Sequence, residues 1–420
     1  MSDTIVGLDI GTSFIKVVIG EINAENAVRV IGFAKKPADG MRNGVIVNVD
    51  LVASIIRETV EQAEQMAGVE ISTVYTAIGG AQVESLNSEG DIVVDTKNLR
   101  TREISEGAKK RALESAQAVA LPLDKDKMHV IPQEYIVDDL PSCKDPVGMQ
   151  GRRLKVRVHI ITASVTASTN IGECIQRAGL ELAGENWLLS KTLVAAMATV
   201  HKDEFELGSI LIDLGGGTTD VMVVYKDAPV FMASIPVGCW YVTNDIAIVK
   251  GISFDAAERI KVQHGCCWIL GNESEEEVII PSVGPNPPEE TTRYELCEII
   301  QPRMDEIFSL VKKEVAQHAQ VSQLNGSIIL TGGGALMPGV VQLAQSVWQT
   351  TSVRVGRVSD MGYPDETYRS SEYATAAGLV LFNRGEAVVT KKKQKSSAAP
   401  QKKDENKFVG GMKKLFKNFF

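Results

Sequence analysis

The sequence predicts an α/β protein in which two sheet-containing domains share a duplicated core, and three glycine-rich loops carry this prediction. Two of the loops, residues 9–13 (DIGTS) and residues 213–220 (DLGGGTTD), lie about 200 residues apart, and each separates two runs of Ile, Leu and Val. A short glycine-containing stretch between such runs is typical of a β-hairpin. The shared order of strand, Asp, Gly, Thr or Ser, and strand indicates an internal duplication.

The third loop joins a strand to a helix. A strand ending at Leu330 precedes Thr331 and the glycines Gly332, Gly333 and Gly334, and a helical pattern follows. Three consecutive glycines leave the backbone open to a flat ring or a sugar. Each of the three loops alone also fits a plain turn, but their occurrence together favours a ligand site.

The first half of the chain continues with alternating strands and a helix. Residues 28–36 (VRVIGFAKK) and 72–80 (STVYTAIGG) read as strands. Between them, apolar residues recur at helical spacing, which predicts a helix, and Asp50 is its expected N-cap residue.

Length and composition agree with more than one domain. The chain has 420 residues, which exceeds the roughly 250 to 300 residues at which a single core stops growing. Its 44% hydrophobic and 23% charged residues are those of an ordinary globular protein.

Charge is distributed unevenly along the chain. Residues 390–420 hold ten lysines against Asp404 and Glu405, a net charge of +8, so the total of -9 leaves -17 on the preceding residues. Such an acidic body disfavours binding to nucleic acid or to an anionic surface. Any affinity for an anionic surface is therefore expected in the C-terminal segment.

Cysteine usage and hydropathy predict a cytoplasmic protein. The six cysteines form no CxxC pair, and we expect them to be reduced and buried, although the adjacent Cys266 and Cys267 leave metal or redox chemistry open. The N-terminus enters a strand pattern without a basic or apolar leader. No run of about 18 apolar residues is present, so no membrane-spanning helix is expected.

The two hairpin loops differ from the common phosphate loops. Rossmann and Walker loops run from a strand into a helix, and neither of their motifs occurs in that context here. Backbone N–H groups in a glycine turn can still form an anion-binding concavity. The carboxylates of Asp9 and Asp213 would repel a phosphate, so we expect a water-bridged Mg²⁺ between them.

These motifs resemble the actin, sugar kinase and heat-shock chaperone ATPase superfamily. LDIGTSFIK is similar to its first phosphate loop, LIDLGGGTTD to its second and ILTGGGALMPG to its adenosine loop. The resemblance implies that two domains grip ATP and Mg²⁺, with Asp9 and Asp213 orienting the metal waters. The nucleotide-binding residues that it implies in the loops are Gly11, Thr12, Ser13, Lys16, Gly215, Gly216, Gly217, Thr218, Gly332, Gly333 and Gly334.

A further pair, Glu258 and Lys261, lies one helical turn apart in SFDAAERIKVQHG. The resemblance assigns this stretch to the nucleoside. Without the resemblance, an exposed ion pair on a helix surface is the simpler interpretation.

Within the superfamily, the chain is similar to the FtsA family of bacterial cell-division proteins. The closer resemblance is carried by HVIPQEYIVDD, PVGMQGRRLKVRVHIIT, IKVQHGCC, IPSVG and the basic amphipathic C-terminus. It implies an actin-like two-domain ATPase fold with a duplicated core and an FtsA-type inserted subdomain.

The family pattern implies a specific division of the chain. The expected units are a first actin-like core (1–82, 163–190 and about 361–383), an inserted subdomain (83–162), a second core (191–242 and 309–360), a small subdomain for FtsZ docking (243–308), a disordered linker (384–406) and an amphipathic helix (407–420).

One departure bears on turnover. Chaperone-like members of the superfamily carry a Glu-Pro step before the small-residue helix that precedes the second phosphate loop, whereas this chain has Lys191 and Thr192 there. A carboxylate at that position would help to orient the attacking water, and a lysine cannot accept its proton. We therefore expect nucleotide binding with slow ATP hydrolysis at most.

The resemblance implies an ATP-binding protein that polymerises into filaments and tethers FtsZ to the cytoplasmic face of the cell membrane at the division septum. Arg303 and Glu306 are the residues expected to meet the acidic C-terminal peptide of FtsZ; without the resemblance they read as a solvated helix face. Other division proteins would dock on the inserted subdomain. The alternative is a small-molecule kinase, which should present a catalytic carboxylate; a chaperone-like ATPase lacks support because no peptide-binding β domain follows residue 390.

The C-terminal segment has the pattern of an interfacial membrane helix. Helical spacing gathers its large apolar side chains on one face and its lysines on another, a layout suited to the headgroup plane. A helix that packs back onto the body, or one that enters a partner groove, is the alternative. The proposed membrane residues are Phe408, Met412, Lys413, Lys414, Leu415, Phe416, Lys417, Phe419 and Phe420.

Overall fold

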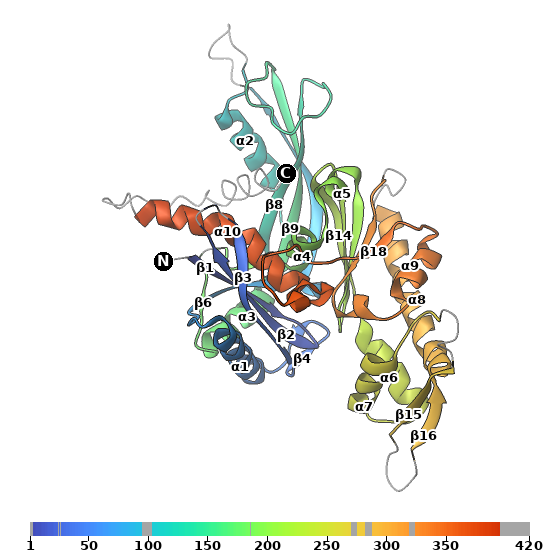
Figure 1. Ribbon diagram of the computed structural model, residues 1–420. Coiled ribbons are helices and arrows are strands. Elements are labelled where there is room, and N and C mark those ends of the chain that lie inside the picture. The colour runs from blue at the N-terminus through green and yellow to red at the C-terminus, as the bar shows by residue number, and fades with distance from the viewer. Residues whose placement is uncertain are drawn as a thin grey trace.

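Two sheets with the same internal order form the centre of the molecule (Figure 1). The computed structural model describes residues 3–23, 25, 27–94, 103–184, 186–269, 275–281, 288–318 and 324–394. In each sheet an antiparallel three-stranded meander begins with the hairpin of a glycine loop, and a parallel strand pairs with the other side of its first strand. The predicted duplication therefore extends from the loops to the strand order.

The first sheet has the order β10-β6-β1-β2-β3, and β11 also pairs with β6. Its strands are β1 (Asp3–Ile10), β2 (Phe14–Ile22), β3 (Val28–Pro37), β6 (Thr73–Ile78), β10 (Glu181–Leu182) and β11 (Leu188–Ser190). The second sheet has the order β14-β13-β12-β17-β18. Its strands are β12 (Ser209–Leu214), β13 (Thr219–Tyr225), β14 (Ala228–Ile235), β17 (Ile328–Thr331) and β18 (Val353–Val355).

Helices cover both faces of each sheet. Helices α4 (Lys191–Thr199) and α10 (Ala374–Gln394) pack on each other, and their side chains share one core with β1, β2, β12 and β13, so they lie between the two sheets. The outer face of the first sheet packs against α1 (Val49–Ala67) and α3 (Val165–Arg177). The outer face of the second sheet packs against α8 (Arg293–His318) and α9 (Val340–Trp348), while α6 (Cys239–Lys250) packs on α8 and on α7 (Phe254–His264) and both join the same hydrophobic core. The hydrophobic strands are buried on both faces because each sheet is enclosed in this way.

Shorter elements complete the two halves. They are α5 (Lys202–Leu207), the strand pairs β4 (Met41–Arg42) with β5 (Val45–Ile46) and β15 (Glu277–Ile280) with β16 (Glu289–Thr292), and the 3₁₀ turns η1 (Gly80–Gln82), η4 (Gly333–Leu336), η5 (Glu366–Arg369) and η6 (Ser371–Tyr373).

Helix α1 begins earlier than the sequence pattern predicts. Its N-cap is Asn48 rather than Asp50, because the Asn48 side chain accepts a hydrogen bond from the Leu51 N–H at 3.1 Å. Asp50 lies inside the first turn, where a carboxylate is favourable to the helix dipole. The helix ends at Gly68, which has the left-handed φ of 67° that favours glycine.

Helix α10 contradicts part of the expected linker. It continues to Gln394, so residues 384–394 are helical rather than disordered. The segment contains Arg, Glu, Ala, Lys and Gln, which have high helix propensity, together with Gly385, Val388, Val389 and Thr390, which have lower propensity. The rest of the expected linker, 395–406, and the expected amphipathic helix, 407–420, lie outside the described residues.

A three-stranded sheet and one helix form a separate unit within the first half of the chain, coloured cyan to green in Figure 1. Strands β7 (Val83–Val93), β8 (Lys125–Val137) and β9 (Arg153–Ser164) pair in the order β7-β9-β8, and α2 (Glu106–Gln117) packs against them around its own apolar core. We call residues 83–164 the inserted unit. It contacts the second sheet through hydrogen bonds to carbonyl oxygens of β14: Asn87 Nδ2 to Val230 O and Gln133 Nε2 to Pro229 O, both at 2.9 Å.

The inserted unit also reaches the first sheet through a buried histidine. His129 Nε2 on β8 accepts a hydrogen bond at 3.0 Å from the N–H of Ser190, the residue that caps α4. Burial lowers the pKa of His129 from 6.5 to about 3 and the pKa of His159, on β9, to about 4. Both rings are therefore neutral in the folded protein at neutral pH.

This burial predicts acid sensitivity. The unfolded chain binds more protons than the folded chain below pH 6.5, so this contribution to stability is complete above pH 6.5 and is lost as pH falls toward the folded pKa. The free energy of unfolding of the unaltered protein should fall between pH 6.5 and pH 5. In a variant with glutamine in place of His129, which can still accept a hydrogen bond from Ser190, this fall should be smaller by about 2 kcal/mol. Urea unfolding of both proteins at the two pH values measures this difference, and equal losses would contradict it.

All six cysteines lie in the described residues, and none of them forms a disulfide. Five of them are buried, as the sequence analysis expects, whereas Cys143 is only partly buried. Among the described helices, none is both long enough and apolar enough to cross a bilayer.

Candidate functional site

The three glycine loops meet at one cavity of about 220 Å³ between the two halves. The turn between β1 and β2, the turn between β12 and β13, and the loop after β17 each contribute to its wall. Helices α6 and α7 line one end, and residues at the start of α10 line another side. This convergence is the geometry expected of a ligand site rather than of three unrelated turns.

Most of the predicted site residues line this cavity. They are Asp9, Gly11, Thr12, Ser13, Lys16, Asp213, Gly215, Gly216, Glu258, Lys261, Gly332, Gly333 and Gly334. Gly217 and Thr218 do not: a Cβ on Gly217 would lie 2.7 Å from Asn43 Cα, and Thr218 lines a second, smaller cavity beside Gly80. Their role in nucleotide binding stays a prediction.

The two hairpin turns have matching geometry. The Gly11 N–H donates to Phe14 O at 3.1 Å, and the Gly215 N–H donates to Thr218 O at 3.0 Å, each closing a turn of the same length. The turns also approach each other closely, because a Cβ on Gly216 would lie 2.1 Å from Ser13 Oγ. A side chain at position 216 would have to displace the Ser13 hydroxyl from this contact.

Two buried carboxylates face two lysines at the centre of the cavity. Asp9 and Asp213 are 2% and 3% exposed. Lys16 Nζ lies 3.6 Å from an Asp9 oxygen, and Lys191 Nζ lies 3.9 Å from Asp9 Oδ1 and 3.7 Å from Asp213 Oδ2. The sequence pattern indicated only that Lys191 stands where a carboxylate could have been, and the structure places its ammonium group between the two hairpins.

Burial and charge shift the pKa values of these groups in different directions. Burial lowers the pKa of Lys16, although Asp9 opposes this shift. Burial would also lower the pKa of Lys191, but Asp9, Asp213 and Asp220 together reverse the effect and raise it above its usual value. Burial, reinforced by the charge of Asp213, raises the pKa of Asp220. Lys191 is therefore firmly cationic.

The arrangement fits a Mg²⁺ ion that keeps its waters. Asp213 Oδ2 is buried and accepts no hydrogen bond, so it can accept one from a metal-bound water. Within the described residues, no group of three or more His, Cys, Asp or Glu side chains could chelate a metal directly. Phosphate oxygens and waters would have to supply the direct ligands, as is usual for Mg²⁺.

Glu258 and Lys261 belong to a partly buried polar cluster. Lys261 Nζ donates to Glu258 Oε2 at 2.6 Å, to Thr243 Oγ1 at 2.8 Å and to Cys239 O at 3.3 Å. The Lys261 side chain is only 9% exposed. The alternative of an exposed surface pair is therefore wrong, and the cluster joins α6 to α7 at the end of the cavity.

The third loop is held in place by a serine that the sequence analysis missed. Gly332 has φ of 81°, and a Cβ there would lie 2.3 Å from Asp213 Oδ1. Its N–H donates to Ser371 O at 3.2 Å, and Ser371 Oγ donates to Gly332 O at 3.0 Å. The surroundings of Gly333 are open, unlike those of Gly332, because a Cβ on Gly333 would meet no atom within 4 Å.

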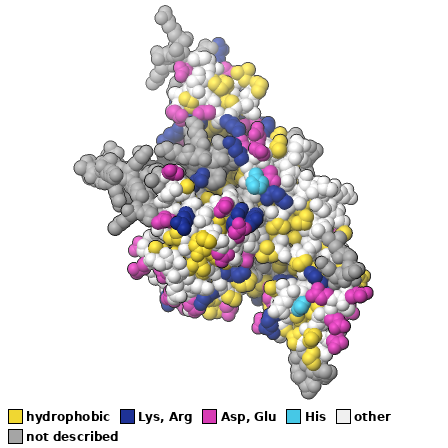
Figure 2. Space-filling view, viewed as in Figure 1, with side chains coloured by type: hydrophobic (Ala, Val, Ile, Leu, Met, Phe, Trp, Pro, Cys, Tyr) yellow, Lys and Arg dark blue, Asp and Glu magenta, His cyan; other side chains and the backbone are white. Residues whose placement is uncertain are grey.

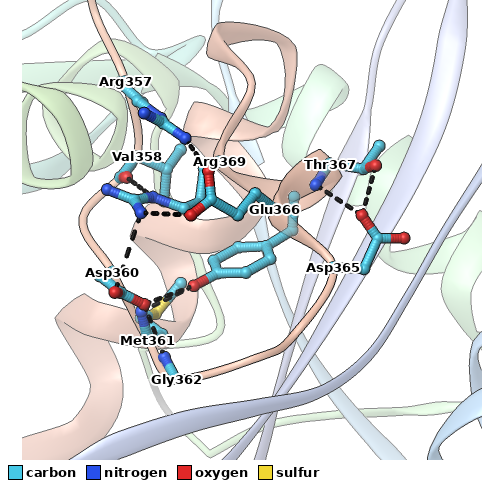
Figure 3. Close-up of polar contacts among 10 residues, drawn as sticks. Arg357, Val358, Asp360, Met361, Gly362, Asp365, Glu366, Thr367 and Arg369 are labelled. Atoms are coloured by element: carbon cyan, nitrogen blue, oxygen red, sulfur yellow. Dashed lines mark hydrogen bonds and ion pairs between the residues drawn. The ribbon is translucent and has the colours of Figure 1, made fainter.

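The segment before Ser371 is fixed by its own polar network (Figure 3). The Met361 N–H donates to the Tyr368 hydroxyl at 2.7 Å, and Arg369 pairs with Glu366 at 3.3 Å and with Asp360 at 3.8 Å. Tyr368 is fully buried beneath these contacts. The network positions the turn that carries Ser371 to the cavity.

Other cavity residues also escaped the sequence analysis. Lys35 and Glu372 line the cavity and pair at 2.8 Å although they are separated by 337 positions. Such a pair leaves no local pattern in the sequence. On β3, Lys35 faces the cavity, whereas the adjacent Lys36 pairs with Glu58 outside it. The sequence did not distinguish these two lysines.

The residues predicted to bind a partner peptide lie on α8, away from the cavity. Arg303 pairs with Glu306, and its Nε donates to Asp245 Oδ2 at 2.7 Å. Its guanidinium carbon lies 5.7 Å from the centre of the Tyr241 ring. Arg303 is therefore held by its own chain, and a carboxylate on a partner would have to compete with Asp245.

On the face drawn in Figure 2, lysines and arginines are interspersed with carboxylates over most of the surface, and carboxylates gather at the lower right end. Apolar side chains appear toward the end that holds α6, α7 and β15, where Ile248, Val249, Val262 and Ile279 are each more than 60% exposed. The predicted membrane residues at positions 408–420 lie outside the described residues.

Comparisons with known proteins agree with the fold and extend it. A family model described as cell division protein FtsA matches residues 210–378, and one described as the SHS2 domain inserted in FtsA matches residues 80–162. The cell division protein FtsA of Borreliella burgdorferi is 37% identical and covers 98% of each chain. That of Pseudomonas aeruginosa is 36% identical over 90% of this chain and 88% of its own.

Solved structures share the architecture at low sequence identity. The PilM–PilN complex of type IV pilus biogenesis superposes with a TM-score of 0.62 at 17% identity, covering 90% of this chain and 97% of that one. MreB5 of Spiroplasma citri bound to ADP superposes with a TM-score of 0.56 at 14% identity, covering 92% and 98%. The expected actin-like fold with an inserted subdomain is confirmed.

Proposed function

This chain belongs to the cell division protein FtsA family, and from that premise we propose that it binds ATP with Mg²⁺, assembles into filaments and links FtsZ to the cytoplasmic face of the membrane at the division septum. The observation that carries the proposal is the convergence of the three glycine loops on one cavity with two buried carboxylates. The fold is shared with MreB5, which was solved bound to ADP.

The nucleotide is proposed to lie across the two hairpins. Backbone N–H groups of the turn residues that follow Gly11 and Gly215 would cradle the phosphates, and Lys16 would supply a positive charge. The nucleoside would lie against Gly333 and Gly334, with Glu258 and Lys261 at its ribose and base.

Asp9 and Asp213 would hold the waters of Mg²⁺, which when bound supplies charge to the phosphates. Helix α4 begins with Lys191, so no carboxylate stands at its start to accept a proton from an attacking water. We therefore propose slow hydrolysis, with ATP acting mainly to hold the two halves together.

A small-molecule kinase is not favoured. The relatives that match nearly the whole chain are cell division proteins. Phosphoryl transfer to a polyol in a soluble assay would reverse this preference.

The FtsZ peptide is proposed to bind beside Arg303 and Glu306. An acidic and apolar peptide would take over the contact that Asp245 makes with Arg303, and exposed apolar side chains such as Ile248 and Val249 lie on the same helix as Asp245.

The C-terminal helix would supply the membrane contact. Each lysine near an anionic leaflet contributes about 1 kcal/mol, so one helix binds weakly and a filament gains avidity.

One flotation assay tests both contacts. The full chain is mixed with a fluorescent C-terminal peptide of FtsZ and anionic liposomes, with ATP and Mg²⁺ present. The unaltered protein should carry the peptide to the lipid fraction. Replacing Phe416 and Phe419 with glutamate should leave both protein and peptide at the bottom of the gradient, because the apolar face is lost.

Replacing Arg303 with alanine should separate the two contacts. This variant should float normally but should carry at least about tenfold less peptide, since an ion pair at the peptide interface is removed. ATP binding by both variants is the control for folding. Flotation of the Phe416/Phe419 variant would contradict the membrane proposal, and normal peptide recruitment by the Arg303 variant would contradict the docking proposal.

A further inference from the structure

Lys191 bridges the two halves of the molecule at the floor of the cavity. It directly follows β11, which belongs to the first sheet, and its backbone is fixed there because the preceding Ser190 donates its N–H to His129. From this position its ammonium group reaches Asp9 in the first hairpin and Asp213 in the second. Its side chain is 22% exposed and lines both the main cavity and the second, smaller one.

The chain makes room for this lysine. A Cβ on Gly79 would lie 3.0 Å from Lys191 Cβ and 3.0 Å from Asp220 Oδ2, so glycine allows the lysine stem to pass between β6 and the second hairpin. Lys191 therefore occupies a shaped channel and does not extend from an open surface.

The charges around Lys191 are unbalanced without it. Asp9 is paired by Lys16, its cross-strand neighbour, at 3.6 Å. Among the described residues, Asp213 forms its ion pair with Lys191, and Asp213 Oδ2 accepts no hydrogen bond. Lys191 thus supplies the positive charge at the place where two carboxylates would otherwise repel both each other and a polyphosphate.

We propose that Lys191 is a resident cation of this cavity, which joins the two hairpins and lowers the dependence of nucleotide binding on a divalent ion. The proposal rests on the nucleotide binding proposed above. A divalent ion normally screens the phosphates from the two carboxylates. With a fixed ammonium already between those carboxylates, part of this screening is present before any metal arrives.

The first test compares ATP affinity with Mg²⁺ and with EDTA by isothermal titration calorimetry. For the unaltered full chain we expect less than about a tenfold difference between the two conditions, whereas Lys191→Met, an unbranched side chain one atom shorter and without the charge, should widen the difference by about tenfold or more. Lys36→Met is the matched control. Lys36 pairs with Glu58 outside the cavity, so this variant should behave as the unaltered chain.

The second test needs no nucleotide. Mg²⁺ alone should raise the melting temperature of Lys191→Met, in which Asp9 and Asp213 lack their shared cation, and should leave that of the unaltered chain unchanged. A difference of more than about tenfold between Mg²⁺ and EDTA in the unaltered chain would overturn the inference even if the variant failed to fold. An unchanged ratio in a folded Lys191→Met protein would also overturn it.

The outcomes separate the two proposals. If the unaltered chain binds no ATP under either condition, the proposed function fails and this inference fails with it. If it binds ATP with Mg²⁺ but loses that binding in EDTA, the function stands and the role of Lys191 is rejected.

Discussion

Replacing Gly333 with leucine should reduce ATP affinity by at least about a hundredfold while the melting temperature of the protein stays nearly unchanged. The expected loss follows from the space around this residue. A Cβ at position 333 meets no atom within 4 Å, and the residue lines the cavity, so a larger side chain would extend into the space for the ligand without striking the protein.

Substitutions at the neighbouring glycines could not separate an effect on ATP affinity from an effect on stability. A side chain on Gly332 would strike Asp213, and one on Gly334 would strike Cys239 Sγ at 2.5 Å, so both substitutions would disturb the fold as well. Gly107→Leu is the matched control, because a Cβ on this exposed residue of α2 would approach only Ser105 Oγ, at 3.7 Å. Undiminished ATP binding by a folded Gly333→Leu protein would show that the nucleotide does not lie against this loop.

Replacing Gly378 with alanine should destabilise the protein by about 3 kcal/mol or more. Gly378 lies in α10 where this helix crosses α4, and a Cβ there would lie 2.0 Å from the Val194 carbonyl oxygen. The Val194 oxygen and the Gly378 Cα that would carry the Cβ both belong to the backbone of packed helices, so the clash cannot be relieved without shifting a helix. Strand β1 restrains α10 as well, since a Cβ on Gly7 would lie 2.1 Å from Ala376 O.

A second helical glycine provides a control, because its replacement by alanine should not lower the free energy of unfolding. A Cβ on Gly172, in α3, would meet its nearest neighbour, a ring carbon of Trp187, at 3.5 Å, which is an ordinary contact. Gly172→Ala should therefore be neutral or stabilising by up to about 1 kcal/mol, because alanine has the higher helix propensity. Urea-unfolding midpoints of the two variants measure the contrast. Equal midpoints would mean that α4 and α10 cross less closely than described.

The strands and loops could be predicted because their signals are local. Runs of Ile and Val on each side of a glycine turn predicted both hairpins, and the repeated Asp before each turn predicted that the two carboxylates would meet. The start of α1 was placed two residues late because Asn48 and Asp50 are both good capping residues. The lysines that suggested a linker are also helix formers, which is why the end of α10 was missed.

The remaining parts of the site depend on contacts between distant segments. Ser371 fixes the third glycine loop, and Lys35 reaches Glu372, but neither contact leaves a spacing that can be read along the chain. Lys191 is the clearest case. Its sequence context indicated only the loss of a carboxylate, whereas the packing of α4 between the sheets gives the same side chain a position between Asp9 and Asp213.

The uneven burial of the thiols gives this protein a natural position for a single label. Cys143 lies in the inserted unit and is partly exposed, while the other five cysteines are buried. Burial, together with the charge of Asp145, raises the pKa of Cys143, so a maleimide dye should react fastest at mildly alkaline pH. A fluorophore placed there, with no cysteine removed from the chain, would report directly whether ATP changes the surroundings of the inserted unit.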